Sequence, residues 1–387
     1  MKKICFVTSS RADYGTIKIL LEEIVKNKKI KSQIIITGSH SSKIFGSDKE
    51  IKRDKRFIIR NVRIKSKNIN PHSVLNSFSE ATKKIGSTLK SLKPDALVVF
   101  GDRYEMLAST IAAYILRINI VHIAGGEKTA GSLDEGFRHS ISKLSNLHFP
   151  VSRVYRKRLI QLGENPKTVF NFGSLNLEKI KKNNYLNKDI IRKKVNIKFF
   201  NKNILVTYHP DTIDSEKSLE NLKIVLNSLK ELKNINFIIT SPNADSQGVI
   251  FIKYIKKYIK KHKLNNFSFH KSLGSQNYLS LLKYVDGVVG NSSSGISEVP
   301  FFGIGTVNIG DRQEGRITTP SIINCHLSKK KIVYSVKKLF SIKFNKKIKK
   351  HYRMYGDGKS AKKIAKKIAN FEYKKYRKKI FYDLNFF

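Results

Sequence analysis

Short apolar runs alternate with amphipathic stretches along the first half of the chain. Four runs have the length and composition of buried strands: Ile4–Thr8, Gln33–Thr37, Ala96–Phe100 and Ile118–Ala124. Stretches with helical spacing of apolar residues lie between them, for example at Gly15–Lys26 and Val74–Leu92. Strands that alternate with helices predict a parallel sheet covered by helices.

The same alternation restarts in the second half. The expected strands are Asn203–Thr207, Asn236–Ser241, Phe267–His270, Gly287–Gly290 and Thr306–Ile309, and the expected helices are Leu219–Leu232, Ile252–His262 and Gln276–Val285. A polar, lysine-rich segment at 173–200 separates the two patterns. The sequence therefore predicts an α/β protein with two Rossmann-like domains facing a central cleft, residues 1–172 and 173–387.

A basic amphipathic helix is expected near the end of the chain, at about 360–376. Ile364, Ile368 and Phe371 form its apolar stripe. Such a helix either packs on a domain, with the N-terminal domain as one candidate, or lies on a membrane surface. We favour the packed role.

Length and composition restrict the class of protein. The chain has 387 residues, of which 40% are hydrophobic, enough for two cores and too many for global disorder. No apolar run approaches the ~18 residues of a membrane-spanning helix, and the run after Lys2 and Lys3 is too short for a signal peptide. Cys5 and Cys325 alone form neither a disulfide framework nor a zinc site. We therefore expect a cytoplasmic protein without a structural metal.

The net charge of +47 allows two interpretations. One is a protein that binds nucleic acid or an anionic membrane. The other is a lysine-rich composition spread over solvated surfaces. The second is favoured because the lysines are dispersed and no zinc-finger, RGG or aromatic-basic RNA-binding pattern is present. Neither a nucleic-acid partner nor membrane insertion is expected.

Polar residues follow each predicted strand of the first half, where ligands of parallel sheets bind. Arg11 follows the first strand, at a helix start suited to an anion. Asp102 and Glu127 follow two later strands, and Asp134 lies one helical turn before Arg138, which is expected to hold it. The structural alternatives are an N-cap for Asp102, an exposed loop position for Glu127 and a helix-dipole partner for Asp134.

The second half offers residues that suit a nucleotide. His209 comes just after a strand, where a binding role and a structural role are equally open. After another strand comes a hydroxyl-rich turn that could hold a diphosphate on its N–H groups, formed by Ser292, Ser293, Ser294 and Gly295. Glu298 is expected three to four residues into the following helix, as an acceptor for ribose hydroxyls.

Taken together, these blocks resemble the hydrolysing UDP-N-acetylglucosamine 2-epimerases of sialic-acid biosynthesis. The matching segments are SSRADYG at 9–15, GDRYEML at 101–107, the stretch 122–149, VTYHP at 206–210, and GNSSSGISEVP with VNIGDRQEGR within 290–316. The family is similar in fold to GT-B glycosyltransferases and to the non-hydrolysing UDP-GlcNAc 2-epimerases. One departure is Ala124, where many relatives carry a polar residue such as His.

The resemblance implies a two-stage reaction. UDP is eliminated from UDP-GlcNAc to leave a 2-acetamidoglucal, and water then adds to give N-acetylmannosamine. The family's catalytic carboxylates fall on Asp102, Glu127 and Asp134, and its nucleotide contacts around Arg11, His209, Ser292, Ser293 and Glu298. Neither a cofactor nor a metal is expected, and relatives suggest a homodimer or homotetramer. Two alternatives stay open: the same reaction on UDP-N,N'-diacetylbacillosamine, and a GT-B glycosyltransferase.

The chemistry itself calls for several carboxylates. Inversion at C2 removes a proton from one face of the sugar and returns one to the other, which requires at least two placed acid/base groups. Carboxylates also stabilise the positive character that spreads over the ring as the anomeric bond breaks. Crowded acids raise one another's pKa, so one of them can be protonated at neutral pH.

Overall fold

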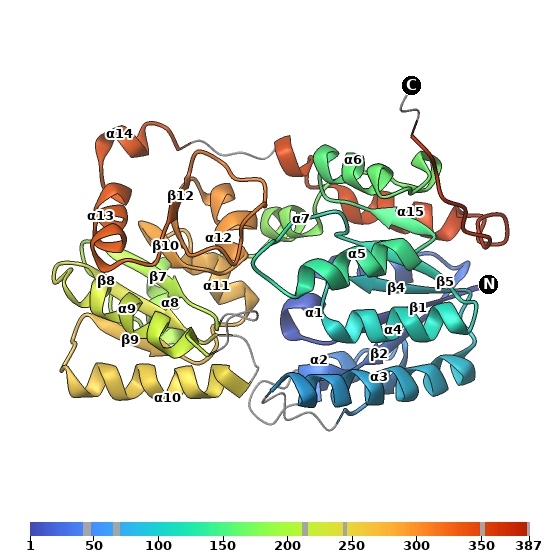
Figure 1. The fold of residues 1–387 in the computed structure, drawn as a ribbon, viewed down its shortest axis with the longest axis horizontal. Helices are drawn as coiled ribbons and strands as arrows, with labels where there is room; N and C mark the ends of the chain where they lie inside the picture. Colours follow the sequence, from blue (N-terminus) through green and yellow to red (C-terminus); the bar gives the residue numbers. More distant parts are fainter. Residues whose placement is uncertain (42–47, 65–69, 211–215, 243–245, 349–352, 385–387) are drawn as a thin grey trace. The chain divides into compact units, whose positions relative to one another are not determined.

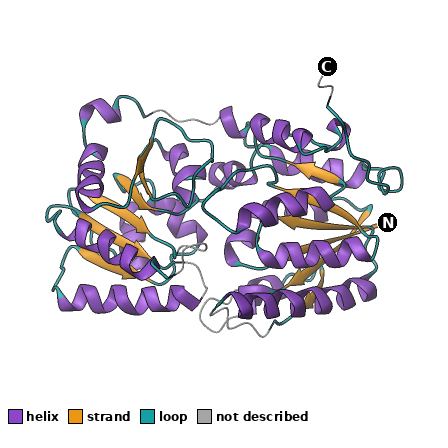
Figure 2. Ribbon diagram, in the orientation of Figure 1, coloured by secondary structure: helices purple, strands orange, loops and turns teal. Residues whose placement is uncertain are grey.

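The computed structural model describes residues 1–41, 48–64, 70–210, 216–242, 246–348 and 353–384. These residues form two compact units, each a Rossmann-like layer structure, which confirms the predicted fold class (Figures 1 and 2). Unit 1 consists of Met1–Glu127, Asp134–Lys181 and Arg353–Phe387, and unit 2 of Lys128–Leu133 and Lys182–Tyr352. These limits differ from the predicted single boundary after residue 172, because the chain enters unit 2 briefly after Glu127 and its C-terminal part returns to unit 1.

Unit 1 is built on a six-stranded parallel sheet of order β3-β2-β1-β4-β5-β6. Its strands are β1 (Lys2–Thr8), β2 (Ile30–Ile36), β3 (Ile58–Asn61), β4 (Ala96–Phe100), β5 (Asn119–Ile123) and β6 (Leu147–Phe149). Its helices are α1 (Arg11–Val25), α2 (Asp48–Lys52), α3 (Pro71–Leu92), α4 (Tyr104–Ile115), α5 (Asp134–Leu144), α6 (Arg153–Gln161), α7 (Leu175–Lys182) and α15 (Ser360–Asn370). Helices α1 and α15 pack on one face of the sheet, and α3, α4 and α5 on the other (Figure 1).

Helix α15 ends at Asn370, earlier than the predicted end near residue 376. The backbone becomes extended at the C-cap, Phe371, and two sets of contacts hold the chain at this point. Lys2 in β1 donates hydrogen bonds to the carbonyl oxygens of Ala369 (2.7 Å) and Phe371 (2.9 Å). The ring of Phe371 also stacks on Tyr376, with centroids 5.0 Å apart, which requires the chain to turn back after the helix. The apolar stripe of α15 is buried in the core of unit 1.

Unit 2 has a second six-stranded parallel sheet, of order β12-β11-β10-β7-β8-β9. Its strands are β7 (Asn203–Thr207), β8 (Asn236–Thr240), β9 (Phe267–His270), β10 (Gly287–Gly290), β11 (Gly305–Ile309) and β12 (Ile322–Cys325). Its helices are α8 (Lys188–Val195), α9 (Ser218–Lys230), α10 (Ser246–Lys261), α11 (Ser275–Leu281), α12 (Ser294–Ser297), α13 (Lys329–Leu339) and α14 (Ile342–Asn345). Helices α9, α10 and α13 contribute to its main core.

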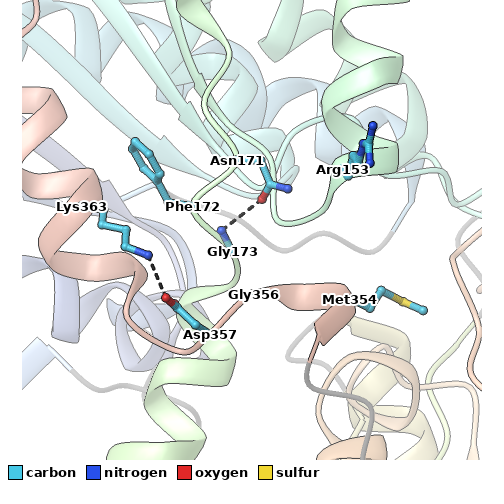
Figure 3. Close-up of a pocket in the computed structure, with 8 residues that line it drawn as sticks. All are labelled: Arg153, Asn171, Phe172, Gly173, Met354, Gly356, Asp357 and Lys363. Carbon is cyan, nitrogen blue, oxygen red and sulfur yellow. Dashed lines mark hydrogen bonds and ion pairs between the residues drawn. The ribbon is translucent and has the colours of Figure 1, made fainter.

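A pocket of about 270 Å³ lies in unit 1, where the segments 171–173 and 354–357 run side by side (Figure 3). At this contact Gly173 has a φ of +89°, and a Cβ there would lie 2.6 Å from the carbonyl oxygen of Tyr355. Lys363 and Asp357 form an ion pair at the pocket, 2.8 Å apart. None of the predicted site residues lines it. Within the ranges given above, no helix is both long and apolar enough to span a membrane.

Candidate active site

Asp102 lies just past the carboxyl end of β4, and its carboxylate is bound by a buried arginine. Arg138, on α5, donates from Nε (2.9 Å) and Nη2 (2.5 Å) to Asp102 Oδ2. The side chain of Arg138 is 1% exposed and that of Asp102 is 24% exposed, so the acid faces outward from a buried cation. The structural alternative for Asp102 is wrong, because the N-cap of α4 is Arg103. Arg138 therefore fixes the Asp102 carboxylate at the edge of the sheet through two hydrogen bonds.

Arg138 also connects this acid to the neighbouring loop. Its Nη1 donates to Glu135 Oε2 (2.8 Å) and to the carbonyl oxygen of Glu127 (3.1 Å). Burial disfavours its charge, but Asp102 and Glu127 raise the pKa of Arg138 above its ordinary value. The sequence predicted that Arg138 holds Asp134, whereas these hydrogen bonds go to Asp102, Glu135 and the Glu127 backbone. Arg138 thus joins three chain segments at the carboxyl end of the sheet.

Glu127 and Asp134 stand at the two ends of the short segment that belongs to unit 2. Within unit 2, the N–H of Ala130 donates to the carbonyl oxygen of Glu314 (2.9 Å), and Gly131 packs against the backbone of Asp311. Asp134 then begins α5. This excursion explains why two residues seven positions apart both belong to the acidic edge of unit 1.

A second arginine–carboxylate pair lies at the same edge and was missing from the predicted site. Arg103 Nε and Nη2 each donate to Glu105, at 3.0 Å, and the Glu105 side chain is 1% exposed. Glu105 raises the pKa of Arg103, and Asp13 and Asp134 add to this effect. Burial raises the pKa of Asp13, which accepts a hydrogen bond from Ser9 Oγ (2.8 Å). All of these residues except Asp134 lie in the motifs at 9–15 and 101–107. These motifs are the sequence signal from which they could have been predicted as site residues.

Acidic side chains are concentrated at this edge of unit 1, although the chain as a whole is strongly positive. Six of its 29 acidic residues follow the carboxyl ends of β1, β4 and β5: Asp13, Asp102, Glu105, Glu127, Asp134 and Glu135. In a protein of net charge +47 such a grouping is not explained by composition. Arg11, by contrast, is exposed at the first position of α1. Within the described residues, no group of three His, Cys, Asp or Glu side chains is arranged to hold a metal ion.

In unit 2, His209 is fixed by a neighbouring asparagine. The His209 N–H donates to Asn291 Oδ1 (2.7 Å), and Asn291 Nδ2 donates back to the His209 carbonyl oxygen (2.9 Å). Arg312 Nη1 and Gln313 Nε2 both donate to the carbonyl oxygen of Asn291, at 3.2 and 3.0 Å. Burial and the charge of Arg312 keep the pKa of His209 well below its ordinary value, so its ring is neutral. Asn291 is the centre of this cluster, and its contacts join residues far apart in the sequence.

The serine-rich turn follows β10 as predicted, but the helix after it is short. Helix α12 has four residues, so Glu298 is its C-cap and does not lie within the helix as expected. The Ser294 hydroxyl donates to Glu298 Oε2 (2.6 Å) and is 2.6 Å from the Tyr278 hydroxyl. Among the described residues, the backbone N–H groups of Ser292 and Ser293 have no hydrogen-bond acceptor.

Two glycines make this turn possible. Gly290 has a φ of +143°, and a Cβ there would lie 1.9 Å from the carbonyl oxygen of Thr207 in β7. A Cβ on Gly295 would lie 2.8 Å from the side-chain methyl group of Thr306 in β11. The turn therefore packs closely on β7 and β11, and a larger residue at either position would push it away from the sheet.

The structure is an α/β fold of two Rossmann-like units with an acidic edge in unit 1, and comparison with known proteins gives its family. The family model described as UDP-N-acetylglucosamine 2-epimerase matches residues 22–369. The chain belongs to this family.

Curated relatives cover most of the chain. It is 42% identical over 330 residues to the GDP/UDP-N,N'-diacetylbacillosamine 2-epimerase (hydrolyzing) of Campylobacter jejuni, with 84% of this chain and 85% of that protein covered. It is 36% identical to polysialic acid biosynthesis protein P7 of Escherichia coli, over 87% of this chain and 85% of that protein. The UDP-N,N'-diacetylbacillosamine 2-epimerase (hydrolyzing) of Legionella pneumophila is 31% identical, over 93% and 94%. The chain is therefore an enzyme of the hydrolysing 2-epimerase type.

Solved structures support the fold. The UDP-GlcNAc 2-epimerase of Neisseria meningitidis, determined with UDP-GlcNAc bound, matches with a TM-score of 0.78 and 19% identity, covering 95% of this chain and 99% of that one. At this identity the match establishes the fold alone.

Proposed function

We propose that the enzyme releases the nucleotide from UDP-N,N'-diacetylbacillosamine and inverts C2 of the sugar. The relatives from C. jejuni and L. pneumophila, both named for this sugar, support this substrate. The resemblance in the sequence placed UDP-GlcNAc first, and the relatives favour the alternative. UDP-GlcNAc is the second candidate, supported by the 29% identical UDP-N-acetylglucosamine 2-epimerase of N. meningitidis.

The chemistry is assigned to the acidic edge of unit 1. In the first stage a carboxylate takes the C2 proton while the bond from C1 to the diphosphate oxygen breaks, its electron pair leaving with the nucleotide, and a glycal forms. In the second stage water adds at C1 and a proton is delivered to the opposite face of C2. Asp102, Glu127 and Asp134 are the proposed acid/base groups. More than one is needed, because a proton is removed from one face of C2 and another is delivered to the opposite face.

The observation that carries this proposal is the Asp102–Arg138 pair. A buried guanidinium binds the Asp102 carboxylate and leaves it partly exposed, which suits a base. Arg138 is in our proposal a positioning residue, since its buried side chain binds carboxylates of the chain. Arg103, paired with Glu105, supplies a second cation among the acids.

The nucleotide is assigned to unit 2. The N–H groups of Ser292 and Ser293, which lack acceptors among the described residues, are suited to phosphate oxygens. Ser294, Gly295 and Glu298 complete this turn, and Glu298 is proposed to accept from the ribose hydroxyls. His209 is held beside it, neutral and able to donate a hydrogen bond. Arg11, exposed at the start of α1, is a further proposed anion contact.

One incubation without an acceptor tests the function. The purified enzyme is offered UDP-N,N'-diacetylbacillosamine, its GDP analogue and UDP-GlcNAc separately, and products are identified by NMR. We expect free 2-epimerised sugar and UDP, fastest from the first substrate. Fastest turnover of UDP-GlcNAc would reverse the choice of sugar. Nucleotide release that requires an acceptor sugar would indicate a glycosyltransferase and contradict the proposal.

A further inference from the structure

A buried histidine ties the backbone before Asp102 to helix α5. His122, in β5, is fully buried; its Nε2 lies 2.9 Å from the Gly101 carbonyl oxygen and its Nδ1 lies 2.9 Å from Ser142 Oγ. A carbonyl oxygen only accepts, so Nε2 carries the proton and Nδ1 accepts from the Ser142 hydroxyl. Burial lowers the pKa of His122 to about 3, so this neutral tautomer persists at physiological pH.

The loop that carries Glu127 closes over this contact. A Cβ on Gly125 would lie 2.7 Å from Ser142 Oγ and 2.8 Å from His122 Nδ1. The backbone two residues before Glu127 is therefore placed by the same pair of side chains. His122 and Ser142 thus support the loops of two proposed catalytic acids.

The C-terminal tail binds the same, C-terminal end of α5. Lys379 Nζ donates to the carbonyl oxygens of Ser142 (3.2 Å) and Ser145 (2.5 Å), and to Glu164 Oε2 (2.5 Å). The Glu164 side chain is 3% exposed. An ammonium group at the last carbonyls of a helix satisfies acceptors that the helix itself leaves open.

Two further hydrogen bonds and the packing of one aromatic ring keep the tail in place around Lys379. Asn146 Nδ2 donates to the Tyr376 carbonyl oxygen, and the Tyr382 N–H donates to the Gly163 carbonyl oxygen, both at 2.9 Å. The Phe381 ring lies against Gly163 and under Lys143, whose Nζ is 4.1 Å from the ring centroid. The tail is thus bound on both sides of the lysine.

We propose that Lys379 is a positioning residue for the active site. Lys379 fixes the C-terminal end of α5. Because Ser142 contacts His122, and His122 contacts the Gly101 carbonyl oxygen, the position of α5 determines the position of the backbone just before Asp102. Each step is a contact given above, and all of them lie in unit 1. The effect on activity rests on the proposed function, but the effect on the His122 ring does not.

The test compares Lys379→Met with Lys378→Met, since Lys378 is the adjacent, exposed lysine. We expect kcat of K379M to fall on the order of 10-fold or more, because small displacements of catalytic groups are costly, while Kd for UDP stays within about twofold. K378M should match the wild type. Partial recovery of kcat in Lys379→Arg would show that the cation is required. Equal kcat in K379M and K378M would overturn the proposal.

A second readout separates positioning from the reaction. The ring nitrogens of His122 are followed by NMR in ¹⁵N-histidine-labelled protein, and assigned with His122→Gln. We expect the His122 signals to shift in K379M and not in K378M. Unchanged His122 signals in K379M would overturn the proposed coupling between Lys379 and His122, whatever the substrate proves to be. A wild-type enzyme that releases no nucleotide, with the His122 shift present, would instead contradict the proposed function.

A double-mutant cycle tests the path itself. Ser142→Ala leaves the tail contacts to backbone carbonyls in place but removes the hydroxyl that His122 accepts from. We expect S142A to lower kcat, and K379M/S142A to lose less than the product of the two single losses. A loss of kcat in the double variant equal to the product of the two single losses would mean that Lys379 and Ser142 act independently, and would contradict the proposal.

Discussion

Replacement of Asp102 by Asn gives the most informative single change at the acidic edge. The amide keeps the size of the side chain and removes its charge. Arg138, 1% exposed, then loses one carboxylate partner and keeps its bond to Glu135. A hydrogen bond between charged groups contributes about 1.5–3 kcal/mol. Because Asp102 is 24% exposed and Glu135 stays, we expect unfolding to become easier by about 1–2 kcal/mol.

The loss of activity should exceed the loss of stability. A general acid/base group contributes on the order of 10²–10⁴-fold, so we expect at least ~100-fold lower turnover, or about 2.7 kcal/mol in the barrier. Nucleotide release is measured by a coupled assay and stability by urea denaturation. Asp95→Asn is the matched control: Asp95 precedes the same strand, β4, and binds the N–H of Lys3. An Asp102→Asn enzyme within about threefold of wild-type turnover would refute the assignment.

Three further changes have defined outcomes. Ser293→Ala removes a hydroxyl and keeps the backbone N–H, and should weaken UDP binding about 2–10-fold by calorimetry, with kcat little changed; unaltered affinity would show that the Ser293 hydroxyl does not bind the nucleotide. Gly290→Ala should destabilise unit 2 by about 3 kcal/mol or more, because its Cβ would meet the carbonyl oxygen of Thr207; a wild-type urea midpoint would contradict this. Burial lowers the pKa of His40 from 6.5 to about 4, with Arg11 and Arg103 adding to the effect. As the pH falls, His40 is therefore protonated in the unfolded chain before it is protonated in the folded protein. At ~1.4 kcal/mol per pKa unit, about 3 kcal/mol of stability should be lost between pH 7 and pH 4. His40→Gln should flatten this dependence, and an unchanged slope would disprove it.

Much of the fold could be predicted because the central strands are buried on both faces. Continuous runs such as Ala96–Phe100 and Asn203–Thr207 are visible without any knowledge of their neighbours. Strands β3, β6 and β12, which are three or four residues long and lie at the sheet edges, were not predicted, whereas the equally short edge strand β9 was. The segment 173–200, which is polar and weakly patterned, contains α7 and α8.

The candidate site could be predicted in part for a similar reason. The carboxyl ends of parallel strands lie at one edge, so residues such as Asp102 could be chosen from their place after a strand. Which side chains pair there depends on tertiary packing. The Asp102–Arg138 bond spans 36 positions and the His209–Asn291 pair spans 82, and no local pattern indicates either. The tail contact of Lys379 with Glu164 spans 215 positions.

Turnover in ²H₂O tests the central claim most directly, because epimerisation by elimination must exchange the proton at C2. Mass spectrometry and ¹H NMR of the released sugar report that position. We expect one deuterium at C2 of the inverted sugar in every molecule released by the wild-type enzyme. Release of UDP with the original hydrogen kept at C2 and its configuration unchanged would mean simple hydrolysis, and would contradict a catalytic role for the acidic edge in proton transfer.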